Sequence, residues 1–404
     1  MSLVGATCEL EVGKVAHGGH CVARWDGRVV FVRHSLPGER VRVRITEGDA
    51  GSRFLRGDAV EVLDPAPGRV PPPCPYAGPG RCGGCDFQHV RPARQRELLG
   101  TVVAEQLRRL GGVERSVTVL PVEPAALGWR TRMGWAVGPD GEVGLRRHRS
   151  HEVEPVDVCL IAHPDTPAVG REPRPGVRRI DTAVSGTGEQ VVLADGVRVA
   201  GPARLTERVR GRSFRVSGAG FWQGHPAAAS TLVAAVQELG RPAAGERAVD
   251  LYSGVGVLAA FLGAAVGVRG AVTAVEADAG AVRDARRNLH DQPQVELVQA
   301  RVDQALRAGR VGQRADLVVL DPPRTGAKAG VVRGIAGLQP RRVVYVACDP
   351  AALARDLATF AEVGYQLSDL RAYALFPMTH HVECVALLEP RAAACEANVP
   401  PRRR

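Results

Sequence analysis

An apolar strand and a glycine-rich turn meet in the stretch AVDLYSGVG, residues 248–256. The pattern predicts a strand over Ala248 to Tyr252, a tight turn, and then a helix over Val257 to Ala265. A strand, a glycine turn and a helix in this order let backbone amides and a helix N-terminus approach a polar ligand. The stretch therefore predicts an α/β sheet that carries a nucleotide-type cofactor at one edge.

Strand and helix patterns keep alternating on both sides of this stretch. Further strands are predicted at residues 271–275, 295–299, 317–320 and 343–346, with helices at 226–238, 278–290, 330–337 and 351–363. Such alternation is typical of a doubly wound, parallel sheet with helices on both faces. Ligands bind at the carboxyl ends of the strands in these folds, so the residues that follow each strand are candidates for a site.

Polar side chains at three of these strand ends suit a nucleotide cofactor. Gly254 lies in the turn, and Glu276 ends the next strand, where a carboxylate can accept hydrogen bonds from ribose hydroxyls. Asp303 follows the third strand and either caps an adenine-binding loop or faces solvent. These features fit S-adenosylmethionine and NAD equally well.

A cysteine and a carboxylate follow the next two strands. Cys348 lies in VACDP, residues 346–350, and Asp321 opens DPPR, residues 321–324. A lone cysteine is usually a small buried hydrophobe, and Asp-Pro-Pro can be a simple turn. At the carboxyl edge of a sheet, however, a thiol meets substrate and can act as a nucleophile. The stretch FPMTHHVE, residues 376–383, adds Glu383 as a possible base.

The N-terminal 64 residues have a different character. Short strands separated by glycine turns are predicted at residues 9–14, 27–32, 40–45 and 59–63, which suits a small closed barrel. Arginines along these strands either follow a phosphate backbone or solvate the outer faces: Arg33, Arg42, Arg44, Arg53 and Arg56.

A proline-rich linker at residues 64–73 marks a domain boundary. We therefore expect four parts: a barrel over 1–64, an α+β central domain over 65–220, an α/β domain over 221–390, and a disordered basic tail over 391–404. Within the central domain, residues 91–110 have the apolar period of an amphipathic helix, which is expected to pack on the α/β domain.

Bulk composition limits the class of protein. The chain has 404 residues, a net charge of +10 and a pI near 9.5, which favours a polyanionic partner. Aromatic residues make up only 4%, so a broad base-stacking platform is not expected. No apolar run is long enough to span a membrane, and residues 1–14 do not read as a signal peptide. A cytoplasmic protein with reduced cysteines is expected.

Three cysteines lie close together after the linker. Cys74, Cys82 and Cys85 form a C-x7-C-x2-C pattern around two glycines, which reads as a metal site with one ligand missing. His89 is one possible fourth ligand.

Five motifs occur in order along the chain: FWQ at 221–223, DLYSGVG at 250–256, LDPPR at 320–324, CDPAALARD at 348–356, and FPMTHHVE at 376–383. In this order they resemble the RNA uracil-5-methyltransferase family, and the match covers essentially the whole chain. The pieces GKVAHGG at 13–19, VFV at 30–32 and LPGERV at 36–41 similarly resemble a TRAM domain, an OB-like RNA-binding barrel. The departures from the family pattern are His225, Ser253, Val257 and Asp349.

The resemblance implies roles for individual residues. Cys348 would be the nucleophile and Glu383 the base, while His380 and His381 remain rival bases. Cofactor and target-base contacts are implied for Gln223, Tyr252, Glu276 and Asp321. Arg355 and Asp356 are expected to pair with each other. Cys159 matches the family's fourth cluster ligand, which favours a [4Fe-4S] cluster over Zn.

These observations predict an S-adenosylmethionine-dependent, monomeric enzyme that methylates uridine C5 in structured RNA, with ribosomal RNA favoured over transfer RNA by analogy. The basic stretches 129–132 and 146–149 are expected to hold the RNA while the target uridine is flipped out. Two alternatives remain: an inactive RNA-binding iron-sulfur protein, or an NAD-dependent oxidoreductase.

Overall fold

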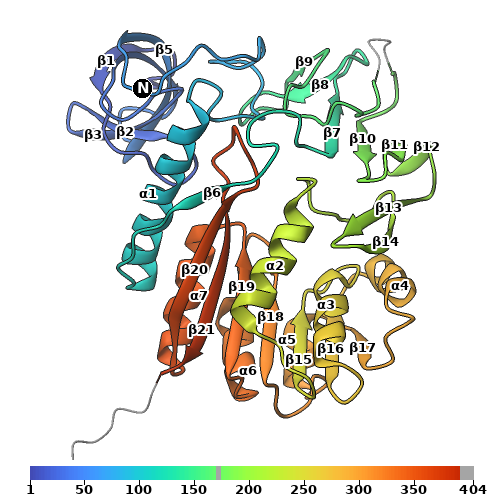
Figure 1. The fold of residues 1–404 in the computed structure, drawn as a ribbon. Helices are drawn as coiled ribbons and strands as arrows, with labels where there is room; N and C mark the ends of the chain where they lie inside the picture. Colours follow the sequence, from blue (N-terminus) through green and yellow to red (C-terminus); the bar gives the residue numbers. More distant parts are fainter. Residues whose placement is uncertain (170–173, 392–404) are drawn as a thin grey trace, which may run out of the picture.

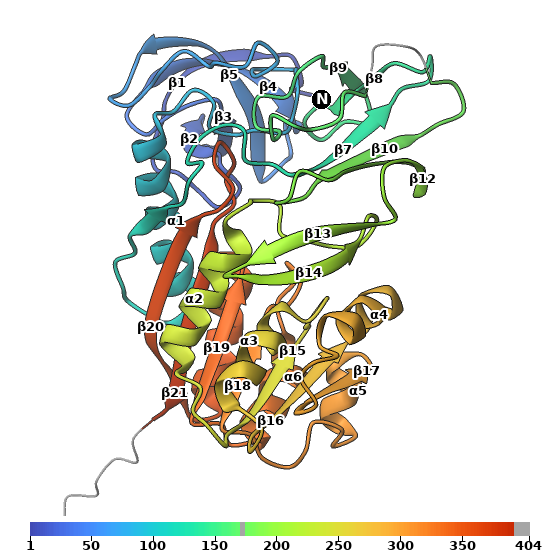
Figure 2. The same cartoon turned by 45° about the vertical axis from the view of Figure 1, so that its right-hand side comes forward.

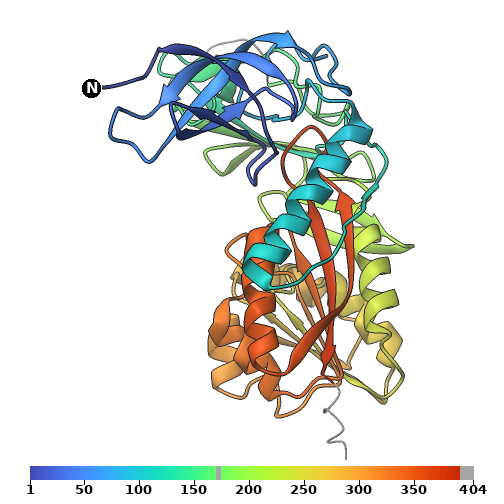
Figure 3. The same cartoon turned by 90° about the vertical axis from the view of Figure 1, so that its left-hand side faces the viewer.

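The computed structural model describes residues 1–169 and 174–391 (Figure 1). The expected tail lies outside these residues from position 392 onward. A small barrel and a central sheet lie above a larger α/β body, and one long helix runs down the side of both (Figures 1 and 3). Among the helices of the described ranges, none is long and apolar enough to cross a membrane.

The barrel is a curled five-stranded sheet in the order β1-β4-β5-β3-β2. Beyond β1 the chain pairs with β2, since the Gly13 amide donates to the Val22 carbonyl at 2.8 Å and the Val22 amide to the Lys14 carbonyl at 2.9 Å. This pairing brings the two edge strands together. The strands are β1 (Thr7–Glu11), β2 (Cys21–Trp25), β3 (Arg28–Arg33), β4 (Arg40–Glu47) and β5 (Phe54–Asp64). The sequence pattern missed β2 and the first half of β5.

The central segment supplies a six-stranded antiparallel sheet, in the order β12-β11-β10-β7-β8-β9, and a separate hairpin. The sheet strands are β7 (Arg132–Val137), β8 (Val143–Arg146), β9 (Val153–Pro155), β10 (Arg179–Val184), β11 (Gln190–Ala194) and β12 (Val197–Ala200). The hairpin consists of β13 (Arg204–Val209) and β14 (Arg212–Ser217).

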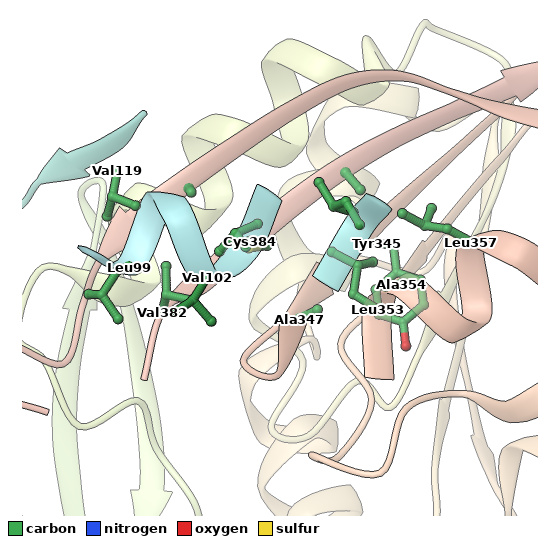
Figure 4. Packing of buried hydrophobic residues seen from close by; sticks show 14 of the residues in the cluster. Leu99, Val102, Val119, Tyr345, Ala347, Leu353, Ala354, Leu357, Val382 and Cys384 are labelled. Atoms are coloured by element: carbon green, nitrogen blue, oxygen red, sulfur yellow. The ribbon is translucent and has the colours of Figure 1, made fainter. Parts of the chain in front are cut away.

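Helix α1 (Pro92–Gly111) and strand β6 (Val119–Pro121) leave the central segment and pack on the α/β body. The apolar face of α1 carries Leu99 and Val102 toward the start of β21 (Figure 4). At its end, a Cβ on Gly111 would lie 3.1 Å from the Ala354 carbonyl oxygen, so helices α1 and α7 approach closely there. One continuous apolar core therefore joins the barrel, α1 and one face of the large sheet.

The α/β body contains an eight-stranded sheet in the order β17-β16-β15-β18-β19-β21-β20-β6. Its strands are β15 (Arg247–Leu251), β16 (Ala271–Glu276), β17 (Val295–Gln299), β18 (Leu317–Leu320), β19 (Arg342–Ala347), β20 (Tyr365–Ala374) and β21 (Glu383–Pro390). The helices are α2 (Ala228–Gly240), α3 (Val257–Val266), α4 (Ala279–Asn288), α5 (Val302–Arg307), α6 (Lys328–Gly337) and α7 (Pro350–Glu362). Helices α2 to α4 cover one face, and α1 with α5 to α7 cover the other (Figure 2).

The predicted fold class is confirmed: a barrel-like N-terminal sheet precedes a Rossmann-like sheet at the C-terminal end. The five parallel strands lie where the apolar runs predicted them. The sequence pattern did not predict β20 and β21. Because β21 runs antiparallel to β19, its first residue lies at the carboxyl edge of the parallel strands.

Candidate active site

Cys348 and Glu383 meet at the carboxyl edge of the sheet. Cys348 directly follows β19, and the Asp349 carboxylate caps α7 by accepting a hydrogen bond from the Ala352 amide at 2.7 Å. Glu383 begins the neighbouring strand β21, in which Cys384 pairs with Ala347 of β19. Glu383 is only 2% exposed. The antiparallel pairing therefore places a buried carboxyl beside the thiol.

Burial controls the charge of these groups. It raises the pKa of the Cys348 thiol to about 12, and the nearby Glu383 and Asp321 charges act in the same direction, while Arg324 opposes them. Burial also raises the pKa of Asp321 to about 7. The pKa of Glu383 is raised well above its ordinary value by burial and by the charge of Asp321. In the free site the thiol is protonated at neutral pH.

This protonation predicts a pH dependence for any reaction of the thiol. Because the pKa of Cys348 lies above the working range, each pH unit gained should raise the thiolate fraction about tenfold. We expect the rate at which Cys348 is alkylated by iodoacetamide to rise about 100-fold from about pH 7 to about pH 9. Mass spectrometry of the peptide that contains Cys348 measures this alkylation rate. A rate that is flat over this range would contradict the buried, protonated thiol.

A polar pair lies next to the thiol. Asp321 follows β18, and its carboxylate accepts a hydrogen bond from the Gln223 side-chain amide at 3.5 Å. Gln223 belongs to the loop before α2, in which Trp222 is buried but Phe221 is 76% exposed. Phe221 thus exposes an aromatic ring two residues before Gln223, and such a ring offers a surface on which a base can stack. Phe221 belongs to the FWQ motif at 221–223, in which no role was predicted for it.

The glycine turn after β15 forms the other half of the site. The Gly254 amide donates to Glu276 Oε2 at 2.9 Å, and the Asp278 amide donates to Glu276 Oε1 at 2.7 Å. Gly256 has a φ of 87°, and a Cβ there would lie 2.8 Å from Leu289 Cδ1, so only glycine fits. Tyr252 has a φ of 64° and bends the chain out of the strand.

Asp250 is a buried acid for which no role was predicted from the sequence. It is fully buried in β15, and burial raises its pKa to about 8, with Asp321 and Glu276 adding to the effect. Three carboxyl groups thus surround the glycine turn: Asp250, Glu276 and Asp321. The only hint in the sequence was the acidic start of DLYSGVG, which reads equally well as part of a strand.

Asp303 lies in the first turn of α5, but its side chain does not cap this helix, whose N-cap residue is Arg301. Its carboxylate pairs with Arg301 at 3.1 Å and with Arg307 at 2.9 Å. The charge of Asp303 helps to raise the pKa of Tyr252 to about 12, after the larger effects of burial and of Asp356. Asp303 therefore lies near the glycine turn, held by arginines.

The loop before Glu383 is hydrogen-bonded to the residues that directly follow Cys85. The amides of Asp86 and Phe87 donate to the Met378 carbonyl at 2.9 and 3.0 Å, and the Met378 amide donates to Gln95 Oε1 at 3.0 Å. Asp86 Oδ2 also binds the His380 amide at 2.9 Å and His380 Nδ1 at 2.6 Å. Sequence reasoning could not find these contacts because nearly the whole α/β domain separates the two segments.

The two rival bases have other partners. His380 is held by Asp86, as described above. His381 Nε2 lies 3.2 Å from Arg324 Nη2, and burial, with the charges of His380 and Arg324, lowers the pKa of His381 to about 3. His381 is therefore a neutral ring that accepts a hydrogen bond from Arg324.

Removing the Asp86 carboxylate should loosen the loop that leads to Glu383. We expect Asp86→Ala to lower the single-turnover rate of the reaction at this site by about 10-fold to 100-fold, because small displacements of reacting groups are costly. The Asp86→Asn variant retains an acceptor oxygen for the His380 amide and should keep most of the activity. Equal rates for Asp86→Ala and the unmodified enzyme would contradict a positioning role.

The four predicted metal ligands lie within electrostatic range of one another. The thiols of Cys159, Cys82 and Cys74 each act on the pKa of Cys85, which burial raises to about 12. Donors approach the sulfurs: the Gly84 amide lies 3.4 Å from Cys82 Sγ, and the Gln88 side-chain amide lies 3.4 Å from Cys85 Sγ. Still, residues 1–169 and 174–391 contain no group of three or more Cys, His, Asp or Glu arranged to hold one metal ion. His89 turns instead toward the Ser35 carbonyl, 3.4 Å away.

Two expectations from the sequence were wrong. Asp356 does not pair with Arg355, because it accepts hydrogen bonds from Tyr345 Oη at 2.7 Å and from the Ala327 amide at 2.7 Å. It thereby anchors the loop after Asp321. The stretch 129–132 is not an open RNA surface, since Trp129 is 3% and Thr131 is 6% exposed and the Arg132 side chain lies beside Glu207.

His225 packs beneath the site rather than facing it. It is 1% exposed, its ring stacks on Trp129 at 6.1 Å, and its Nε2 lies 3.3 Å from the Pro124 carbonyl. Burial lowers its pKa, so the ring is neutral. This departure from the family pattern therefore affects packing at the start of α2 first.

Comparisons with known proteins agree with this geometry. A TRAM domain model matches residues 1–60, a methyltransferase small domain model matches 220–334, and a tRNA (uracil-5-)-methyltransferase model matches 310–391. The Pyrococcus abyssi tRNA (uracil-54, C5)-methyltransferase, solved in complex with S-adenosyl-L-homocysteine, superposes with a TM-score of 0.72 over 94% of this chain and 99% of that chain. At 21% identity this likeness shows a common fold.

Sequence relatives are closer. A protein of Streptomyces avermitilis described as an uncharacterized RNA methyltransferase is 48% identical, over 96% of this chain and 99% of its own length. A Streptomyces coelicolor protein with the same description is 49% identical, over 97% of this chain and 94% of its own length. With these relatives and the motifs at the sheet edge, the chain belongs to the RNA uracil-5-methyltransferase family and is an RNA methyltransferase.

Proposed function

We propose that this enzyme uses S-adenosylmethionine to methylate C5 of a uridine in structured RNA through a covalent bond between Cys348 and C6. The observation that carries the proposal is the placement of the Cys348 thiol beside the buried Glu383 carboxyl, next to the Gln223–Asp321 pair. A nucleophile and a base at one strand edge are what substitution at a pyrimidine carbon requires.

The residues divide the chemistry among them. C5 of uracil is a poor nucleophile, but once the Cys348 thiol has lost its proton to solvent, addition of the thiolate to C6 makes C5 enolate-like and nucleophilic. S-adenosylmethionine, when bound, supplies the methyl group. C5 then carries both the methyl group and its original proton, so the ionised form of Glu383 takes this proton. The electron pair re-forms the C5–C6 double bond, and the Cys348 sulfur leaves C6.

Gln223 and Asp321 suit the polar edge of uracil. An amide offers both a donor and an acceptor, and a carboxylate can accept from the ring N–H. Phe221, two residues before Gln223, exposes an aromatic ring on which a base can stack. This arrangement supports a flipped-out target uridine in the pocket.

The charge around the glycine turn favours a cationic cofactor. The charges of Asp321 and Glu276 add to the burial that raises the pKa of Asp250, and a bound sulfonium with its ammonium group would relieve this repulsion. NAD, a dinucleotide, brings two negative phosphates and would increase the repulsion. The carboxyl groups therefore support S-adenosylmethionine over NAD, with Glu276 and Tyr252 as further contacts.

Glu276 provides a test of this cofactor assignment. Glu276→Gln should weaken S-adenosylmethionine binding by about 10-fold or more, because a charge-assisted hydrogen bond contributes roughly 1.5–3 kcal/mol. Isothermal titration calorimetry with S-adenosylmethionine and with NAD measures the affinity for each. Glu296→Gln, on the neighbouring strand β17, is a control that should bind normally. Tighter binding of NAD than of S-adenosylmethionine by the unmodified protein would overturn the assignment.

The reaction itself is tested with RNA that contains 5-fluorouridine. Fluorine cannot leave C5 as a cation, so the enzyme should stop as a methylated adduct that resists denaturation and maps to Cys348. Parallel incubations with ribosomal and transfer RNA decide the substrate, for which we propose ribosomal RNA. If RNA and S-adenosylmethionine both bind but no adduct forms with either RNA, the nucleophile assignment is removed.

The cysteine cluster is proposed to hold [4Fe-4S], with zinc as the alternative. The support is the donor set: four thiols in electrostatic range, with N–H groups near the sulfurs. Cys74, Cys82, Cys85 and Cys159 would be the ligands. Iron, sulfide and zinc analysis of protein purified without oxygen distinguishes the two. We assign the cluster a structural role, since Asp86 and Phe87 beside it hold the loop before Glu383.

The remaining expectations complete the proposal. We propose a monomeric cytoplasmic enzyme in which residues 1–64 bind RNA, 65–220 carry the cluster and 221–390 perform methylation. The inactive RNA-binding alternative predicts no S-adenosylmethionine binding, so the titration with this cofactor also decides that question.

A further inference from the structure

A cleft of about 490 Å³ lies between the barrel and the turn that joins β8 to β9. Strands β3, β4 and β5 form one wall, and residues 147–150 with Glu152 form the other. Arg149 of the turn pairs with Glu47 of the barrel at 2.9 Å, so the walls are in direct contact. The volume lies within the range of pockets that hold small ligands.

Arg33 at this cleft has donors without acceptors. It is 8% exposed, and its nearest carboxylate oxygen, on Asp58, lies 3.8 Å away, too far for a hydrogen bond. Its Nη2 has no partner in the described parts of the chain, and neither does Nε of Arg56. A buried guanidinium with unmet donors costs free energy, which an anion in the cleft would offset.

A flat surface adjoins these arginines. The Arg56 guanidinium lies 4.9 Å from the centre of the Phe54 ring and 5.8 Å from that of Phe31. Phe54 is 42% exposed, although it is a large apolar side chain. Nucleic-acid bases stack on aromatic rings and on guanidinium planes.

The charge of the cleft suits a single phosphate. Four arginines line it, at 33, 56, 147 and 149, against three carboxylates at 47, 58 and 152. His20 and His148 add no charge at neutral pH, because burial lowers the pKa of each to about 4. The arginines outnumber the carboxylates by one, so the cleft has a net charge of +1. This charge matches one backbone phosphate rather than a polyphosphate.

The cleft lies near the active-site loop. His20 lines it, and the charges of Asp86 and His380 act on the pKa of His20. At neighbouring Gly19, a Cβ would lie 2.9 Å from His380 Cβ. An RNA strand in the active site would therefore pass close to this cleft.

We propose that the cleft between the barrel and the β8–β9 turn binds one nucleotide of the RNA other than the target uridine. Its phosphate lies at Arg33, and its base stacks beside Arg56 and Phe54. The identity of the ligand as RNA rests on the proposed function, whereas the anion site and the stacking surface do not.

The test compares two arginines of the barrel. Binding of a fluorescein-labelled oligouridylate of 12 nucleotides to the full-length protein is measured by anisotropy over a salt series. Arg33→Met should weaken binding about 10-fold and reduce the salt slope by about one. Arg24→Met removes an exposed arginine of β2 outside the cleft and should change affinity less than about twofold. Equal losses for the two variants would overturn the proposal.

A second variant and a cross-link test the cleft independently of whether the Arg33→Met variant folds correctly. Phe54→Ala, at an exposed position, should weaken binding about 10-fold without changing the salt slope. Oligouridylate containing 4-thiouridine should cross-link to the peptide that carries Phe54, and cross-linking only elsewhere would exclude the cleft. If no Cys348 adduct forms with 5-fluorouridine RNA but the cross-link to the Phe54 peptide does form, the proposed reaction is refuted and the proposed cleft is not. An acidic peptide that competes fully with the oligonucleotide would point to a protein partner instead.

Discussion

Cys348→Ser is expected to lower methylation by about 10⁴-fold or more and to abolish the adduct with 5-fluorouridine RNA. The hydroxyl is a much weaker nucleophile than a thiolate, so C6 is not attacked and C5 never becomes nucleophilic. The buried surroundings, which already hold the thiol in its protonated form, disfavour an alkoxide even more. Single-turnover transfer of a labelled methyl group to RNA measures the loss.

A matched control separates this loss from a general effect of removing sulfur. Cys8 lies on β1 of the barrel and, like Cys348, is a free and partly buried thiol. Cys8→Ser should leave the rate unchanged, and both variants should bind S-adenosylmethionine normally. A Cys348→Ser enzyme that keeps a tenth or more of the activity would end the covalent mechanism.

Glu383→Gln is expected to give the opposite phenotype: an adduct that accumulates with ordinary RNA. The variant can still add its thiol and accept the methyl group at C5, but an amide cannot remove the C5 proton. Turnover should fall by about 10²-fold to 10⁴-fold, the usual contribution of a general base. Gel analysis should find methylated RNA joined to the protein.

The base assignment has its own controls. Glu389→Gln, near the far end of β21 and paired with Arg342 at 3.0 Å, should turn over normally. His380→Gln and His381→Gln should slow the reaction without trapping the adduct, since both rings are held by other side chains. Trapping by a histidine variant, with normal release by Glu383→Gln, would move the base to that histidine.

The parallel half of the fold and the position of the Cys348 thiol at the sheet edge were readable from the sequence. Short apolar runs such as 317–320 and 343–346 can be buried on both faces, which is typical of central parallel strands. The positions after such strands lie at one edge whatever the loop lengths, so Asp321 and Cys348 were predicted to share a site. The glycines at 254 and 256 marked the turn for the same local reason.

The tertiary structure decided the surroundings of the thiol. Glu383 reaches Cys348 because β21 pairs antiparallel with β19, a long-range register that no local pattern encodes. The attachment of Asp86 to His380 joins segments nearly 300 residues apart, and the buried Asp250 reads locally as part of a strand.

What the sequence by itself determined about this protein was each chemical group and its place on a strand, turn or helix, since these depend on neighbours in the chain. Proton affinities and the cleft at Arg33 arise from burial and from charges brought together by folding. Those properties depend on distances through space, so only the tertiary structure could decide them.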